Sequence, residues 1–209
     1  MLINDIKISG DKNILLGNSL FFCIPLKNDF PVKIYDEKKT KIIKGRAFIY
    51  NSKNEDVIFQ SENQSWKIEK RSFFICARLL AFIDYARDFS KMTAIGSEFD
   101  INQQVFYIED TNKSLEYVLI NEAIKAESQL EPLFVTIRHS ESYWLILHLI
   151  SYLDEKKSNI AQIGERYGVS GTHFRRLCKR YLGNCGKSQL RSWRAASSIL
   201  TTLSTDESL

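Results

Sequence analysis

The stretch Ile160-Ala-Gln-Ile-Gly-Glu-Arg-Tyr-Gly-Val-Ser-Gly-Thr-His-Phe-Arg-Arg-Leu-Cys-Lys179 is the most informative part of the chain. Two helices that cross over a tight turn need a small residue where they touch, a glycine near the turn and apolar residues on their inner faces. Gly164 is the small contact residue, and Gly168 can adopt the positive φ that ends a helix. Ser170 is a natural N-cap for a second helix. The stretch therefore predicts a helix-turn-helix.

The second helix of this pattern has an apolar inner face. Phe174 and Leu177 are three residues apart and form that face, so the remaining positions point outward or flank the helix. A recognition helix places its N-terminal half against base edges in the major groove, where arginine can bind guanine and a threonine methyl group can contact thymine. We therefore expect Thr172, Arg175 and Arg176 to read bases.

Further residues around this helix are candidates for contacts with the DNA backbone or for flanking positions. Phosphates suit basic side chains further along the helix and on the next one. Simple solvent exposure is the alternative for the basic side chains, and packing between helices is a further alternative for His173. The candidates are Ser170, Gly171, His173, Lys179, Arg180, Arg191 and Arg194.

The excess positive charge lies in the C-terminal third of the chain. The whole sequence has 29 basic and 25 acidic residues, a formal net charge of +4. Residues 158–194 hold eight basic side chains and one acidic side chain, Glu165, whereas the basic and acidic residues of 1–139 balance. This local excess suits a polyanion such as double-stranded DNA, and a solvated basic surface is the alternative interpretation.

Two further helices are predicted beside the helix-turn-helix. Residues 143–153 form an apolar run that Ser140 or Ser142 can cap, and Ser158 can cap the helix that follows. A last helix is expected from residue 185 to 202. The chain beyond residue 138 is thus predicted to be helical throughout.

Trp193 lies on the apolar stripe of the predicted last helix, together with Leu190. An aromatic residue at helical spacing within such a stripe usually packs in a core. We therefore expect Trp193 to be a core residue.

The first 137 residues carry strand patterns and helix patterns. Short runs rich in β-branched and aromatic residues predict strands, and a turn-rich break at 51–56 predicts a hairpin between the strands beside it. Pro132 and the polar run 139–142 mark the expected domain boundary. The predicted strands are 19–25, 32–35, 43–50 and 57–59, with 105–108 as a further candidate, and the predicted helices are 71–89 and 114–129.

These patterns together predict an α+β protein of two domains. Residues 1–137 are expected to form a β-rich N-terminal domain with helices that serves regulation or self-association. Residues 138–209 are expected to form an all-α helix-turn-helix domain that binds DNA.

Composition and motifs exclude several other classes of protein. The chain is 44% hydrophobic and 26% charged, as is usual for a soluble globular protein. Its four cysteines form no Cys-x-x-Cys pair and its three histidines show no zinc spacing, so we expect reduced thiols, no metal and no cofactor. No nucleophile with an oriented base and no Gly-rich phosphate loop is present, so we expect no enzyme. Glu116 and Glu122 are interpreted as solvent-facing charges.

The sequence also gives expectations about location. The first residues lack the basic and apolar regions of a signal peptide. The longest apolar runs are well short of the roughly 18 residues that a membrane helix needs. We therefore expect a cytoplasmic protein that does not bind membranes.

The C-terminal residues resemble a known family. The runs Ser140-Glu-Ser-Tyr-Trp-Leu145, Tyr167-Gly-Val-Ser-Gly-Thr-His-Phe-Arg-Arg-Leu-Cys178 and Leu190-Arg-Ser-Trp-Arg194 resemble the DNA-binding domain of AraC-type transcriptional activators. The resemblance is strongest to the InvF and MxiE group, which activates virulence genes of bacterial type III secretion systems. It covers about residues 138–203 and implies an activator that binds specific DNA sequences and works with RNA polymerase. The positions that contact bases in the family fall on the same threonine and two arginines.

This sequence differs from AraC-type domains in one respect, and the resemblance implies two protein partners. AraC-type domains contain two helix-turn-helix units joined by a long helix, which the helix at 185–202 matches. The sequence ends at Leu209 without a second unit, so we expect a shortened activator that binds DNA weakly or that regains a second contact as a homodimer. Activators of this group depend on a secretion chaperone as coactivator. The alternative function is a truncated regulator that acts by protein interaction, through titration of that chaperone or through mixed dimers.

Overall fold

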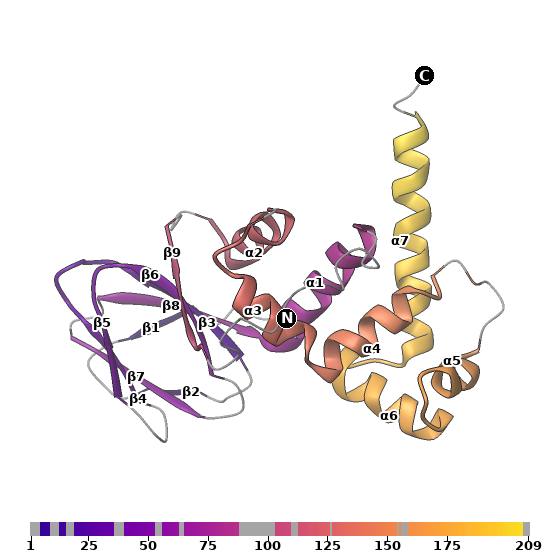
Figure 1. Ribbon diagram of the computed structural model, residues 1–209, viewed down its shortest axis with the longest axis horizontal. Helices are drawn as coiled ribbons and strands as arrows, with labels where there is room; N and C mark the ends of the chain where they lie inside the picture. The colour runs from indigo at the N-terminus through magenta and orange to yellow at the C-terminus, as the bar shows by residue number, and fades with distance from the viewer. Residues whose placement is uncertain are drawn as a thin grey trace. The chain divides into compact units, whose positions relative to one another are not determined.

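The chain folds into two compact units, the first rich in strands and the second built of helices (Figure 1). The computed structural model describes residues 5–8, 13–15, 19–35, 40–52, 56–62, 65–87, 103–109, 113–125, 127–153, 155 and 159–206. The first unit comprises Met1–Leu80 and Ala94–Ile137, and the second comprises Ala81–Thr93 and Arg138–Leu209. The predicted α+β class is confirmed.

One sheet of the first unit has five antiparallel strands in the order β1-β8-β3-β6-β9. Its central strand β3 pairs with β8 through Phe22 and Glu69 and with β6 through Phe22 and Ile49. Phe21 and Phe22, whose side chains point to opposite faces, are both fully buried, so the central strand is covered on both faces. The strands are β1 (Asp5–Ile8), β3 (Ser19–Pro25), β6 (Ala47–Asn51), β8 (Trp66–Ser72) and β9 (Val105–Ile108).

A second, four-stranded sheet shares its core with the first. Its order is β2-β7-β4-β5, with β2 (Asn13–Leu15), β4 (Val32–Tyr35), β5 (Thr40–Ile43) and β7 (Val57–Ser61). The Phe21 and Phe59 rings, one from each sheet, meet edge to face at 5.3 Å. Side chains of both sheets therefore form one aromatic-rich core, which includes Phe48 and Trp66.

Two sequence predictions for these strands are wrong. The predicted strand 43–50 is interrupted: Ile43 ends β5 and residues 47–50 belong to β6, which lies in the other sheet, because Gly45 takes a φ of +68° and turns the chain between them. The hairpin expected across 51–56 does not exist, because β6 pairs with β3 and β9 whereas β7 pairs with β2 and β4. Two consecutive strands that lie in different sheets give the same local pattern as a hairpin.

Three helices accompany the sheets: α1 (Phe73–Ala86), α2 (Leu115–Ile124) and α3 (Glu131–Arg138). Ser114 caps α2 by accepting a hydrogen bond from the Tyr117 N–H, and the helix ends five residues earlier than predicted. Pro132, expected at the domain boundary, lies in the first turn of α3, where the missing N–H leaves no helical bond unmade. The junction of α1 with the second unit lies between Leu80 and Ala81.

Glu122 on α2 is not the solvent-facing charge that the sequence predicted, whereas the Glu116 side chain is 40% exposed. Glu122 is buried and binds Lys125 and Ser128. The Arg71 Nε atom, on β8, donates to Glu116 at 2.5 Å, and this contact lowers the pKa of the Glu116 carboxyl although burial raises it. Both carboxylates therefore hold the ends of α2 in place.

The second unit contains α4 (Glu141–Ile150), α5 (Ile160–Arg166), α6 (Gly171–Leu182) and α7 (Gly186–Asp206). Of the two serines considered for α4, Ser140 is the N-cap and accepts from the Tyr143 N–H. Asn159 caps α5 in a capping box with Gln162. Ser158, predicted for that role, lies outside the described residues. None of the described helices is long and apolar enough to cross a membrane.

Candidate nucleic-acid interface

Helices α5 and α6 meet at two glycines. A Cβ atom on Gly164 would lie 2.8 Å from the Phe174 Cβ, and one on Gly171 would lie 3.1 Å from the Ala161 Cβ. Gly168, in the turn between the helices, has a φ of +88°. Two helices can approach this closely only where a side chain is absent, so the predicted helix-turn-helix is present in its predicted register.

The inner face of α6 packs on aromatic rings. Phe174 is fully buried, and its ring lies 5.5 Å from that of Tyr167 and 6.2 Å from that of His148. The His148 Nε2 atom lies 2.9 Å from the Ile163 carbonyl oxygen, which joins α4 to α5. Burial lowers the pKa of His148, as does the charge of Arg166, against the opposing effect of the hydrogen bond to Ile163. The neutral imidazole therefore donates to that carbonyl.

The outer face of α6 carries the residues predicted to read bases. Thr172, Arg175 and Arg176 are all exposed, and they lie on the side of the helix opposite the buried Phe174 and Leu177. Within the part of the chain that the structure describes, no carboxylate pairs with either arginine. Their guanidinium groups are therefore free to bind an anion or a base edge.

The predicted backbone and flanking residues on α6 fall into two groups. Lys179, Arg180 and His173 are exposed, and the Arg180 guanidinium lies over the neighbouring Tyr181 ring at 5.3 Å. Ser170 accepts a hydrogen bond from the His173 N–H, so its hydroxyl is occupied as the N-cap. Gly171 packs against α5 as described above. Lys179, Arg180 and His173 are thus better placed for a ligand than Ser170, which caps the helix, and Gly171, which packs on α5.

Arg194 has a structural role that the sequence did not indicate. Its guanidinium donates to the carbonyl oxygens of Leu153, Tyr152 and Glu155 at 2.7 to 2.8 Å. These bonds fasten the loop between α4 and α5 to α7 and satisfy carbonyls beyond the end of α4. Arg191, three residues earlier, is exposed. Arg191 is therefore available for a contact with phosphate, whereas the guanidinium of Arg194 is already used in contacts within the protein.

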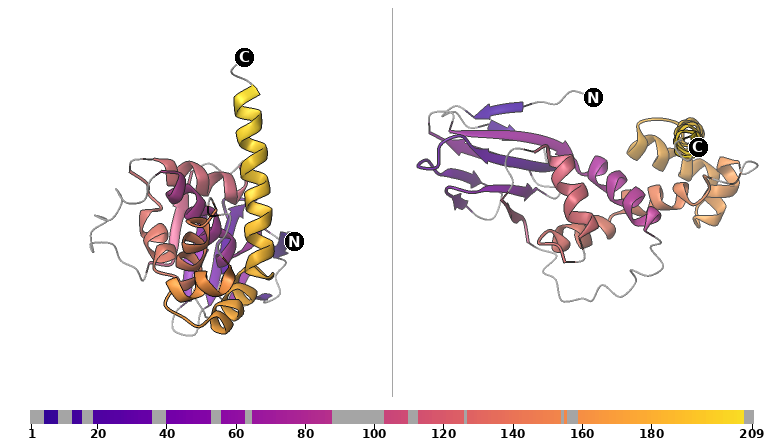
Figure 2. Two further views of the ribbon diagram at one scale, coloured as in Figure 1. Left: turned by 90° about the vertical axis from the view of Figure 1, so that its right-hand side faces the viewer. Right: turned by 90° about the horizontal axis from the view of Figure 1, so that it is seen from above.

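Trp193 packs as its position in the sequence predicted, although it is half-buried. Its ring meets the Phe82 ring of α1 edge to face, with centroids 5.1 Å apart. The C-terminal half of α7 extends beyond α4, α5 and α6 (Figure 2). Leu190, in the first turns of α7, is buried in the core of this unit.

The cysteines offer no second site. Cys23, Cys76 and Cys178 are buried and Cys185 is exposed, and all four are free thiols. Burial raises the pKa of Cys178 to about 11, which keeps it a thiol. Among the residues that the structure describes, no three His, Cys, Asp or Glu side chains gather as metal ligands would.

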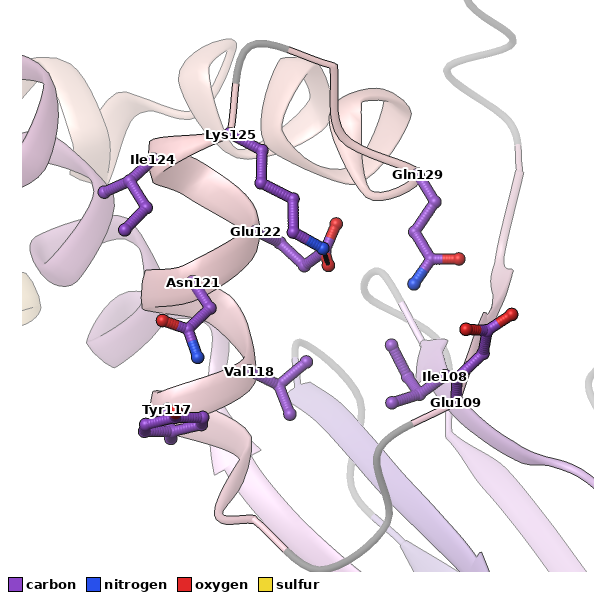
Figure 3. A pocket seen from close by; sticks show the side chains of 9 residues that line it. All are labelled: Ile108, Glu109, Tyr117, Val118, Asn121, Glu122, Ile124, Lys125 and Gln129. Atoms are coloured by element: carbon purple, nitrogen blue, oxygen red, sulfur yellow. Dashed lines mark hydrogen bonds and ion pairs between the residues drawn. The ribbon is translucent and has the colours of Figure 1, made fainter.

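The first unit has an open groove of about 410 Å³ between α2 and the end of β9 (Figure 3). Ile108 and Val118 form its apolar part, and the ion-paired Glu122 and Lys125 lie at one end. Its remaining lining residues are Glu109, Tyr117, Asn121, Ile124 and Gln129. Because apolar, polar and charged side chains all line this groove, its chemistry does not favour one class of ligand.

Comparison with known proteins identifies relatives. The chain is 35% identical over 136 residues to the invasion protein InvF of Salmonella typhimurium, which is 65% of this chain and 62% of InvF. It is 31% identical over 132 residues to the transcriptional regulator MxiE of Shigella flexneri, which is 60% of this chain and 61% of MxiE. The chain thus matches about three fifths of the length of these relatives. No protein-family model matches it.

Solved structures resemble the chain more distantly. ToxT from Vibrio cholerae is 11% identical, with 90% of this chain and 97% of ToxT covered at a TM-score of 0.32. The AraC-like transcriptional activator CuxR is 10% identical, with 87% and 68% covered at a TM-score of 0.37. The firmer similarity of this chain is therefore the one in sequence, to the invasion protein InvF and the transcriptional regulator MxiE.

Proposed function

We propose that this protein is a sequence-specific DNA-binding regulator of transcription in which α6 enters the major groove. The observation that carries the proposal is the outer face of α6, where Arg175 and Arg176 are exposed without a carboxylate partner among the described residues. Thr172 lies in the first turn of the same helix. In a helix-turn-helix these early outward positions face base edges, and arginine is the side chain that most often binds guanine.

Residues beside this face supply contacts with phosphates. Lys179 and Arg180 lie one turn further along α6, and Arg191 is exposed on α7. Charged contacts with phosphates hold a recognition helix in register without reading sequence. His173 flanks the same surface. Ser170 and Gly171 position α6 itself, so their contribution to DNA binding is indirect.

The relatives suggest the genes and the partners. MxiE bears the name of a transcriptional regulator and InvF that of an invasion protein. We infer that this protein activates virulence genes of a type III secretion system, together with RNA polymerase and with a secretion chaperone as coactivator. A homodimer would place two copies of α6 on one DNA site. Under this proposal the protein acts in the cytoplasm.

An alternative function is regulation by protein interaction, in which the chain binds the chaperone or forms mixed dimers and binds DNA weakly or not at all. The observation that bears on it is that the described residues offer α6 as a recognition helix. One recognition helix buries less surface on DNA and meets fewer phosphates than two.

Selection from a random pool of duplexes tests the proposal. The purified protein is compared with the Arg175→Ala/Arg176→Ala variant at low and at physiological salt. We expect the protein to enrich one motif and the variant to lose preference at the positions that the arginines read, by about 1–3 kcal/mol each. A motif that both proteins enrich equally contradicts the assignment of α6.

The matched control removes the same two charges from the other unit. Lys33 and Lys44 are exposed in the sheet unit, and the Lys33→Ala/Lys44→Ala variant should select the same motif as the unchanged protein. If a folded protein enriches no motif at either salt concentration, the chain does not read sequence unaided. Retained binding of a secretion chaperone in that case supports the alternative function.

A further inference from the structure

A fully buried carboxylate lies in the helical unit, outside the surface described above. Asp84, near the end of α1, is 0% exposed. Arg138 donates to it twice, with Nε 2.8 Å from Oδ2 and Nη2 3.0 Å from Oδ1, and the Tyr143 hydroxyl donates to Oδ2 at 2.8 Å. Burial and the nearby carboxylate raise the pKa of Tyr143, so its hydroxyl remains a donor. Neither recognition of DNA nor the core of the helix-turn-helix explains this cluster.

The cluster joins three elements at one point. Asp84 belongs to α1, Arg138 is the last residue of α3 and Tyr143 lies in the first turn of α4. In a bidentate pair a guanidinium donates two hydrogen bonds to one carboxylate. Such a pair fixes both the orientation of the two side chains and the distance between them, whereas an apolar contact does not. The start of α4 is therefore held in a defined position on the end of α1.

Helix α4 in turn holds both helices of the DNA-binding motif. Its His148 contacts the Ile163 carbonyl of α5, as described above. At its first residue, the Glu141 carboxylate accepts a hydrogen bond of 2.6 Å from Tyr181 near the end of α6. A contiguous series of contacts thus leads from Asp84 through α4 to the recognition helix.

The end of α1 makes a second contact with this unit. Phe82, one turn before the end of α1, packs on Trp193 of α7. Earlier in the helix, Cys76, Ala77 and Leu80 are buried and belong to the sheet unit. One uninterrupted helix therefore supplies core residues to both units.

We propose that the last turns of α1 are a working part of the DNA-binding unit and that Asp84 is a positioning residue for the recognition helix, acting through Arg138, Tyr143 and α4. The proposal rests on the proposed function, since it assigns a role in DNA binding.

The test uses the whole chain with Asp84→Asn, which keeps the size of the side chain and removes its charge. Amide hydrogen exchange is measured across the chain, and affinity is measured on the duplex that the unchanged protein selects. We expect faster exchange in α4, α5 and α6, unchanged exchange in β3 and β6, and a loss of affinity of about tenfold or more. Tyr143→Phe removes one hydrogen bond and retains the ring, and it should weaken binding about threefold.

Two control variants separate positioning from general stability. Glu116→Gln removes one of the two carboxylates that pair with the buried Arg71 in the sheet unit, and it should leave the affinity and the exchange of α4 to α6 unchanged. Asp84→Leu/Arg138→Met replaces the ion pair by apolar side chains, an exchange that often restores stability. We expect it to restore the melting temperature while the affinity stays low.

Three results would overturn the inference: unchanged affinity and exchange in folded Asp84→Asn, an equal effect of Glu116→Gln, or full recovery of affinity in the apolar double variant. If the unchanged protein binds no duplex, the proposed function fails by itself. The exchange of α4, α5 and α6 in Asp84→Asn then still decides whether α1 positions those helices.

Discussion

Gly164 shows how one absent side chain determines the contact between two helices. An added methyl group would lie 2.8 Å from the Phe174 Cβ and 3.1 Å from its Cγ, and these atoms lie at the base of a fully buried side chain. Gly164→Ala should therefore move α6 away from α5 and lower the free energy of unfolding by about 1–3 kcal/mol. Chemical denaturation measures the change.

The neighbouring residue supplies the control for this prediction. Glu165 is exposed on the same helix, and Glu165→Ala should change the free energy of unfolding by less than about 0.5 kcal/mol. Equal stability of the Gly164→Ala protein and the unchanged protein would mean that α5 and α6 are not packed this closely.

Arg191 and Arg194 are alike in the sequence and different in the structure. Arg194→Ala removes three hydrogen bonds to carbonyls and should lower the free energy of unfolding by about 1–3 kcal/mol, without changing how DNA affinity depends on salt. Arg191→Ala should leave the stability unchanged and lower the slope of log affinity against log salt by about one unit. Denaturation and salt titration of both variants test the assignment, and the reverse pattern would refute it.

At the scale of the element, the proposed function divides α6 into an earlier half that would read bases and a later half that would contact phosphates. Lys179 lies in the later half and is exposed. Lys179→Ala should weaken binding to all duplexes alike and lower the salt slope by about one unit, because one phosphate contact is lost. Titration of a selected and a scrambled duplex measures this. A loss confined to the selected duplex would assign Lys179 to base reading instead.

His148 makes the junction of α4 with the helix-turn-helix sensitive to pH. Burial holds its pKa in the folded protein below the usual value, so the unfolded chain takes up this proton at a higher pH. The contribution of neutral His148 to the free energy of unfolding is complete above the unfolded pKa of about 6.5. It is lost as the pH falls from that value through the lower pKa of the folded protein. Denaturation between pH 8 and 5 should show a smaller fall in stability for His148→Gln than for the unchanged protein.

The exposed His173 provides the control for the pH dependence. His173→Gln removes an imidazole from the surface of α6 and should leave the pH profile of stability as it is in the unchanged protein. A profile of His148→Gln that is as steep as that of the unchanged protein would show that other groups cause the fall.

At the scale of the whole molecule, the sheet unit depends on aromatic contacts between its two sheets. Phe59 of β7 is fully buried and packs against Phe21 at 5.3 Å and Tyr50 at 5.8 Å, both in the other sheet. Phe59→Ala should destabilise this unit by about 3–5 kcal/mol. Ile42 on β5 is 60% exposed, and Ile42→Ala should cost less than about 0.5 kcal/mol. Similar losses in the two variants, measured by denaturation, would contradict the shared core.

The helix-turn-helix was predictable because its determinants are local. The glycine at the contact, the glycine at the turn, the serine cap and the inner apolar residues all lie within twenty consecutive residues. They act through backbone geometry and through neighbours on the same helix, and the structure reproduces their register. The exposure of Thr172, Arg175 and Arg176 follows from the same periodicity, while their contacts with DNA stay a prediction.

The pairing of strands and the roles of buried charges depend on residues far apart in the chain. The pattern of residues 43–50 is compatible with one strand, and only the pairing of β5 with β4 and of β6 with β3 divides it between two sheets. The partners of Asp84 lie 54 and 59 residues away, and those of Arg194 about 40 residues away. The sequence by itself determined the helix-turn-helix, because turn geometry and helical periodicity are short-range. The tertiary structure alone decided which strands pair and which charges are buried, because these depend on long-range packing.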